Sequence, residues 1–171
     1  MLIALSPVGP DGPIPAARRI AALAFILAVT FGIGAVGGWV TAPNIPGWYE
    51  NLNKPNFNPP NWLFAPVWSA LYFVISIAAW LAWQAAPATQ RLSLLAIYGG
   101  QLVLNMLWSI FFFALHQPLL AYVDCLLLAA TIAWMMVRFR RVNRLAGWLI
   151  FPYLLWVAFA TLLNIAIVLL N

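Results

Sequence analysis

Long apolar runs separated by short polar breaks dominate this chain. A bilayer core of about 30 Å needs roughly 20 apolar residues in a helix to cross it, and five runs reach that length. They predict spanning helices at about residues 19–40, 62–83, 92–113, 119–137 and 145–170. The break containing Pro87 is short, so the second and third helices are expected to be antiparallel neighbours. The pattern predicts an all-α membrane protein, a five-transmembrane-helix bundle.

Composition supports this interpretation. Hydrophobic residues make up 65% of the chain, charged residues only 6%, and the mean hydropathy is +0.96. Soluble proteins carry roughly a quarter charged residues. We therefore expect one transmembrane domain over residues 17–171. Residues 1–16 are rich in Pro and Gly and are predicted to form a disordered tail.

The stretch from Trp48 to Trp68, WYENLNKPNFNPPNWLFAPVW, is the one segment unlike a hydrophobic span. Its prolines restrict the backbone and lower the entropy lost on ordering, which favours a folded cap over a flexible linker. The alternative is an interfacial belt in which Trp and Tyr anchor helix ends. We predict a Pro/Trp-rich loop that caps a pocket, joining helices one and two.

Basic residues gather on one side of the predicted bundle. Seven arginines fall on the side of the N-terminus, whereas Lys54 stands alone on the other side. The positive-inside rule then predicts a cytoplasmic N-terminus and explains the net charge of +5 without nucleic acid. A lone His116 and a lone Cys125 predict no metal site.

The third span carries a polar and aromatic stripe formed by Gln101, Asn105 and Trp108. Side-chain amides in hydrocarbon need hydrogen-bond partners, so this stripe must face the bundle interior. It is either interhelical hydrogen-bonding or the polar part of a ligand cavity. Asp124, the one carboxylate within a span, likewise either joins helices or faces a cavity.

Aromatic residues on other helices favour the cavity. Trp68 and Tyr72 lie on the second span, and Trp156 and Ala160 on the fifth. At 1.5 Å per residue, Trp68, Asn105 and Ala160 share a layer about 9 to 14 Å below the loop side, with Trp156 deeper, as a floor. These residues predict an aromatic pocket under the loop.

Several motifs resemble those of the TspO/MBR family, the tryptophan-rich sensory proteins related to the mitochondrial translocator protein. The motifs, in family order, are W-Y-x-x-L-x-K-P at 48–55, P-P-x-W at 59–62, P-V-W at 66–68, Q-x-x-x-N-x-x-W-S at 101–109, V-D-C-L-L at 123–127 and P-Y-x-x-W-x-x-F-A-x-x-L-N at 152–164.

The resemblance implies a five-helix bundle, commonly dimeric, that binds porphyrins such as protoporphyrin IX under the first loop. By motif match Trp48 belongs to the lid and Trp68, Asn105, Trp156 and Ala160 line the pocket. Trp68 and Trp156 also match tryptophans linked to porphyrin breakdown. Lys54 is a candidate partner for a porphyrin carboxylate. The ligand-binding candidates together are Trp48, Trp68, Tyr72, Gln101, Asn105, Trp108, Asp124, Trp156 and Ala160.

The resemblance, with the predicted pocket, implies a tetrapyrrole-binding sensory or regulatory protein. A transporter and a light- and oxygen-dependent porphyrin-degrading enzyme are the alternatives. No catalytic constellation or required cofactor is found in the sequence, which favours binding over catalysis. Small residues Ala96, Gly99 and Gly100 favour a homodimer through the third helix. The fifth helix ends without the Tyr and basic residue of cholesterol-binding relatives, so sterol recognition there is not expected. A bacterial cell membrane is the expected location, with a bacterial or mitochondrial outer membrane as the alternative.

Overall fold

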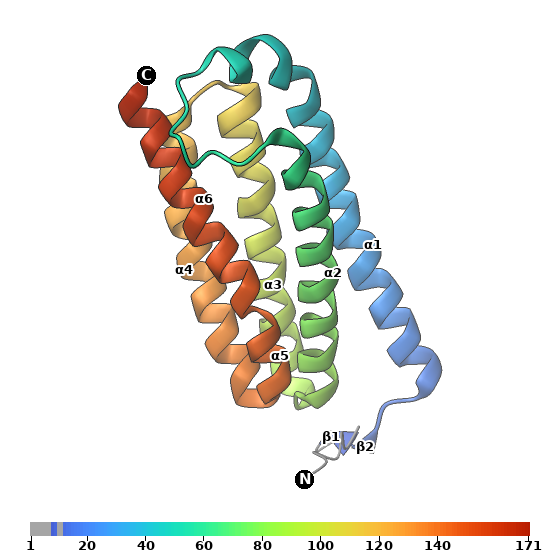
Figure 1. Cartoon of the computed structure of the whole chain (residues 1–171). Coiled ribbons are helices and arrows are strands. Elements are labelled where there is room, and N and C mark those ends of the chain that lie inside the picture. The colour runs from blue at the N-terminus through green and yellow to red at the C-terminus, as the bar shows by residue number, and fades with distance from the viewer. Residues whose placement is uncertain (1–7, 10–11) are drawn as a thin grey trace.

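The structure, a computed structural model, describes residues 8–9 and 12–171 and forms a bundle of long helices (Figure 1). Within that part of the chain, five helical segments are long and apolar enough to cross a membrane. The helices are α1 (Ala16–Thr41), α2 (Asn61–Ala85), α3 (Ala88–Ser109), α4 (Pro118–Val142), α5 (Arg144–Leu149) and α6 (Phe151–Leu170), with α5 and α6 in one segment. The predicted all-α, five-helix membrane architecture is confirmed.

Shorter elements connect and extend these helices. A helical turn, η1 (Ala42–Asn44), and a segment kinked at Pro46 and Gly47, η2 (Ile45–Tyr49), follow α1, and η3 (Ile110–Ala114) extends α3. A two-residue strand β1 (Val8–Gly9) pairs antiparallel with β2 (Gly12–Pro13) ahead of α1. The predicted disorder of residues 1–16 falls largely outside the described residues and stays a prediction.

The fourth helix differs from its prediction. The sequence predicted an end near residue 137, but α4 continues to Val142. Arginine is a good helix former, and its long side chain carries the charge from a helical backbone out to the headgroups. The turn comes only at Asn143, whose side-chain oxygen accepts a 2.9 Å hydrogen bond from the Ala146 N–H and caps α5.

The helices do not pack equally. The α4 helix packs against α3 and α6, and α1 packs against α2 and α3. Only 17% of the most apolar window of α1 is buried, against 33 to 39% in the other segments. Figure 1 shows the N-terminal half of α1 diverging from the bundle. This helix is therefore the most exposed wall of the molecule.

The two ends of the bundle are packed differently. Toward the α2–α3 turn, Ala78, Ala79 and Ala82 of α2 are buried to 1% exposure or less. At the opposite end, residues 42–60 cross over the helices on the same side as the C-terminus (Figure 1). We call the end under this loop the loop half and the end bearing the arginines the arginine half. The site described next lies in the loop half.

Candidate functional site: an aromatic cavity under the first loop

A cavity of about 510 Å³ lies among α1, η2, α2, α3, α4 and α6. Its walls are mostly apolar, and no charged side chain of the described residues lines it. The volume is within the range of about 300 to 1,000 Å³ that small-molecule sites in proteins occupy. The cavity is therefore large enough and apolar enough for an organic ligand.

Small residues form the α1 wall of the cavity. A Cβ atom on Gly34 would overlap the ring of Tyr72, and one on Gly37 would lie 3.3 Å from the Ser109 hydroxyl oxygen. Gly34 therefore allows α1 and α2 to pack closely. Gly38 borders the cavity, and an added Cβ there would meet no atom within 4 Å.

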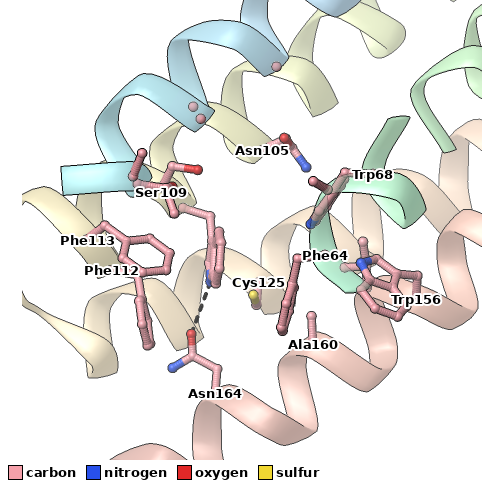
Figure 2. A pocket seen from close by; sticks show the side chains of 18 of the residues that line it. Phe64, Trp68, Asn105, Ser109, Phe112, Phe113, Cys125, Trp156, Ala160 and Asn164 are labelled. Carbon is pink, nitrogen blue, oxygen red and sulfur yellow. Dashed lines mark hydrogen bonds between the residues drawn. The ribbon is translucent and has the colours of Figure 1, made fainter. Parts of the chain in front are cut away.

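Large rings form the α2 and α6 walls. Figure 2 shows Phe64, Trp68 and Trp156 grouped on one side of the cavity, with Phe112 and Phe113 on the other. The Trp68 ring lies 5.4 Å from that of Tyr72, and the Phe64 and Trp156 rings meet edge to face at 6.0 Å, both between centroids. Aromatic pairs at these separations stabilise one another by about 0.5 to 1.5 kcal/mol beyond area burial. The rings thus form a preorganised surface.

A chain of hydrogen bonds runs from the cavity wall into the core. The Tyr72 hydroxyl donates to Asn105 Oδ1 at 2.6 Å, and Asn105 Nδ2 donates to the Tyr153 hydroxyl at 3.3 Å. Tyr153 in turn donates to Gln101 Oε1 at 2.8 Å. Because Asn105 has used its oxygen and one N–H, it keeps one N–H donor for a guest.

A second polar link closes the wall between α3 and α6. Trp108 Nε1 donates to Asn164 Oδ1 at 3.1 Å, as the dashed line in Figure 2 marks. Asn164 Nδ2 donates to the Pro118 carbonyl at 2.8 Å, so three helices meet at this side chain. The indole N–H of Trp108 is therefore used in this hydrogen bond between helices, and the rest of the ring borders the cavity.

Most of the predicted ligand-binding residues come together around this cavity. Its lining includes Trp68, Tyr72, Asn105, Trp108, Trp156 and Ala160. Three others lie outside its lining: Trp48, Gln101 and Asp124. The two interpretations of the third-span stripe both apply, since Asn105 borders the cavity and Gln101 is fully buried behind it as hydrogen-bonding scaffold.

The loop contributes Tyr49 to the cavity in place of Trp48. Gly47, with a φ of 88°, turns the backbone just before these two residues. Trp48 turns away and stacks on His116 at 4.4 Å between ring centroids, and His116 Nε2 lies 3.1 Å from Asn44 Oδ1. Tyr49 is 6% exposed and lines the cavity, with its hydroxyl donating to Asn58 Oδ1 at 3.0 Å.

Lys54 does not present its charge to the cavity. Its ammonium donates to the carbonyls of Tyr49, Glu50 and Leu52 at 2.6, 3.1 and 3.0 Å. It also lies 4.7 Å from the centroid of the Tyr49 ring. Three acceptors use all three donors of an ammonium, so the expected pairing with a ligand carboxylate has no donor left. Lys54 instead holds the turn that carries Tyr49.

The loop is also fastened to α6. The Asn53 N–H donates to Asn171 Oδ1 at 2.9 Å, and Asn171 Nδ2 donates to the Asn53 carbonyl at 3.0 Å. Asn53 Nδ2 further donates to the Leu170 carbonyl at 3.1 Å. The cap predicted from the prolines is thus tied to the end of the helix that carries Trp156 and Ala160.

Asp124 is buried on α4, at 4% exposure, and its Oδ2 has no hydrogen-bond partner within the described residues. Its neighbour Cys125 lines the cavity. Successive helical residues point about 100° apart, which separates the carboxylate from the cavity that the thiol reaches. Asp124 is therefore placed in the packing between helices.

Sequence reasoning missed part of the lining. Phe64, Phe113 and the glycines of α1 were not among the candidates. Phe64 precedes Trp68 by about one helical turn, so helical periodicity could have placed Phe64 on the same face of α2 as Trp68. The glycines carried no such signal, because a small residue that borders empty space has the same sequence pattern as one that packs against a helix.

The fold and cavity together define a multi-pass membrane protein with a mostly apolar, aromatic cavity beneath a structured loop. Comparison with known proteins gives the same class: the profile of the TspO/MBR family matches residues 24–170. The chain belongs to the TspO/MBR family.

Relatives are similar over most of their length. The tryptophan-rich protein TspO of Archaeoglobus fulgidus is 42% identical over 149 residues, 87% of this chain and 95% of the relative. The human translocator protein is 35% identical over 147 residues, 85% of this chain and 86% of the relative. The tryptophan-rich sensory protein of Cereibacter sphaeroides is 39% identical over 124 residues, 72% of this chain and 77% of the relative.

Proposed function

We propose that this protein binds a planar tetrapyrrole, such as a porphyrin, in the aromatic cavity and acts as a membrane sensor or regulator. The observation that carries the proposal is the cavity itself, a space of about 510 Å³ walled by Trp68, Trp108 and Trp156 and roofed by Tyr49. A flat conjugated guest gains most from stacking on such rings. The names of relatives, which call some of them sensory and others translocator proteins, agree with a role in response or transport.

In this proposal, Asn105 orients the ligand through a hydrogen bond. Its remaining N–H is a donor on an otherwise apolar wall, and Trp156 Nε1 has no hydrogen-bond partner among the described residues. A buried donor left without a partner costs about 1 to 3 kcal/mol. A ligand with an acceptor beside Asn105 would satisfy the remaining Asn105 N–H and be fixed in orientation, whereas Trp156 Nε1 is buried in the wall.

We further propose that the arginine half faces the cytoplasm of a bacterial cell. Arg19 of α1, Arg91 of α3 and the basic end of α4 lie at one end of the bundle, and Lys54 lies at the other (Figure 1). The excess of arginine at one end supports this orientation through the positive-inside rule. The cavity would then open toward the outer side of the membrane.

A homodimer through α3 is part of the same proposal. Ala96, Gly100 and Val103 form an exposed stripe on this helix, and Cβ atoms added to Gly99 or Gly100 would meet nothing within 4 Å. Such small exposed residues allow two helices in a bilayer to approach closely. We expect Gly100→Leu to weaken cross-linked dimers of the membrane-embedded protein while ligand affinity is kept.

The binding proposal is tested by titrating purified protein with protoporphyrin IX in darkness and following tryptophan fluorescence. Saturable quenching is expected, with an affinity about two- to twelvefold weaker in Trp156→Phe, because one favourable ring contact is worth about 0.5 to 1.5 kcal/mol. The matched control is Trp134→Phe, since Trp134 is 54% exposed on the outer face of α4. Quenching that does not saturate would overturn the proposal.

Two further measurements on the same protein distinguish the sensor from a porphyrin-degrading enzyme and from a transporter. Light-dependent loss of the porphyrin absorption band, slower in Trp68→Phe and Trp156→Phe, would assign degradation to the cavity. Porphyrin accumulation in sealed vesicles that contain the protein would assign transport. Saturable binding without either result supports the sensor.

A further inference from the structure

Seven arginines belong to the arginine half, and the structure shows what several of them contact. Arg19 donates to Gln84 Oε1, and Arg91 Nε donates to the carbonyls of Trp83 and Ala86 at 3.3 and 3.1 Å. Arg140 lies 5.2 Å from the centroid of the Trp148 ring. These three side chains therefore act within the scaffold.

Two of the other arginines share a hollow. Arg138 and Arg141, from the last two turns of α4, line a second pocket, distinct from the aromatic cavity. Its remaining walls come from the end of α2, the α2–α3 turn, the start of α3 and the last residue of α4: Ala85, Pro87, Gln90 and Val142.

Within residues 8–9 and 12–171, no acidic side chain lies near this hollow to neutralise the charge of its two arginines. The two carboxylates there are Glu50, in the loop at the opposite end, and Asp124, near the start of α4 at that same opposite end. Neither Arg138 nor Arg141 forms an ion pair in the described part of the chain, so both keep their donors for an external acceptor. Guanidinium groups bind phosphate oxygens strongly, and in a bidentate manner.

The surroundings of the hollow are lipid-facing. Trp134 and Val137, one turn or less before Arg138 on α4, are 54% and 44% exposed. The Arg138 guanidinium lies 6.0 Å from the Trp134 ring centroid, an arrangement typical of side chains at the boundary between hydrocarbon and headgroups. A ligand here would have its anionic group on the arginines and its apolar part along α4.

We propose that the hollow between the end of α4 and the α2–α3 turn binds the phosphate headgroup of an anionic phospholipid. The acyl chains of this lipid lie against the exposed face of α4 beside Trp134. The site is independent of the aromatic cavity and does not depend on the proposed tetrapyrrole binding.

Native mass spectrometry of the full-length protein, released from detergent with added lipid, tests the proposal. Phosphatidylglycerol should give a retained one-to-one adduct, and phosphatidylcholine of the same chain length should not. The variant Arg138→Gln/Arg141→Gln should weaken the phosphatidylglycerol adduct at least about tenfold, as expected for two surface arginines that each contribute about a factor of five.

The matched control is Arg18→Gln/Arg144→Gln, which removes the same charge from exposed positions at the same end but leaves the hollow intact. Equal losses in both double variants would overturn the proposal, because the lipid would then respond to net charge alone. A single Arg141→Gln change, at an exposed side chain, keeps the test valid if the double variant unfolds.

A second arm distinguishes a lipid from a free anion. Thermal stability is measured with inorganic phosphate in place of lipid. Stabilisation by millimolar phosphate that matches the effect of phosphatidylglycerol would overturn the lipid assignment. Protoporphyrin quenching should be unchanged in all these variants, which separates this site from the cavity.

Discussion

The two halves of α2 show why the cavity lies where it does. In the loop half, α2 carries Phe64, Trp68 and Tyr72, and large rings keep the neighbouring helices apart around an open space. In the arginine half, the same helix carries Ala78 and Ala82, which are fully buried. Small side chains allow helices to approach closely, and interiors then pack with few voids. The side chains that α2 buries thus differ between the half that holds the cavity and the closed half.

The halves also use polar groups differently. In the loop half, Asn105 and Tyr72 are hydrogen-bonded to each other while bordering the cavity. Farther toward the arginine half, Tyr98 shares hydrogen bonds with Thr30 and Ser76, 2.6 and 3.3 Å away, within a closed core. Both sets satisfy buried polar atoms, but only the first leaves a donor for a guest.

The sharpest test of this comparison places the same ring in each half. Ala160→Phe fills the cavity and should lower porphyrin affinity at least about 100-fold, which is about 2.7 kcal/mol. Its melting temperature should change little, because the ring enters existing space. Ala82→Phe should instead destabilise the fold by about 1 to 3 kcal/mol or more, since no space is available there. The measurements are fluorescence titration and thermal melting of each variant in detergent.

Near-wild-type affinity in a well-folded Ala160→Phe protein would remove the cavity as the binding site. A stable Ala82→Phe protein would show that the arginine half also adapts to added volume.

The next largest effect is expected from the hydrogen-bond chain. Tyr153→Phe removes the hydroxyl that joins Asn105 and Gln101, leaving buried polar atoms unsatisfied. A loss of about 1 to 3 kcal/mol in stability is expected. Tyr122→Phe is the control, because within the described residues the Tyr122 hydroxyl makes no hydrogen bond. Equal melting temperatures for both variants would contradict a structural role for the chain.

A smaller effect is expected from Lys54→Met. The carbonyls of Tyr49, Glu50 and Leu52 lose their shared donor, so the roof of the cavity loosens and porphyrin affinity should fall about three- to tenfold. Glu50→Gln is the control, since Glu50 is exposed and changes the loop charge alone. Binding is measured with protoporphyrin IX and with a porphyrin of similar size that lacks carboxylates.

The two ligands separate positioning from charge pairing. Equal losses for both porphyrins are expected if Lys54 holds Tyr49 in place. A loss confined to the carboxylate-bearing porphyrin would restore the direct pairing that the sequence predicted.

Trp134→Phe should have the smallest effect. The residue is outside both the cavity and the core, so stability is expected to stay within about 0.5 kcal/mol and porphyrin affinity unchanged. A clear loss of porphyrin affinity in this variant would mean that quenching reports general helix packing.

Much of this architecture was predictable because a bilayer restricts the solutions. Five apolar runs could only be five helices, since unpaired backbone groups are too costly in hydrocarbon. Helical spacing then placed Trp68 and Tyr72 on one face of α2, and Trp156 and Ala160 on one face of α6. The family motifs pointed to the same residues, and the structure brings them around one cavity.

Other features were decided only by tertiary structure. The choice of Tyr49 over Trp48 for the cavity depends on a backbone turn at Gly47 and on a stacking partner, His116, that is distant in sequence. The role of Lys54 depends on three carbonyls that converge only when the loop folds.

By itself, then, the sequence determined the number of helices, their faces and the family, because these follow from local periodicity and the cost of polar backbone in lipid. Which polar side chains border the cavity and which are used up in the scaffold was decided by packing. A hydrogen bond is made only with whatever lies within about 3 Å in space, and sequence spacing does not contain that distance across helices.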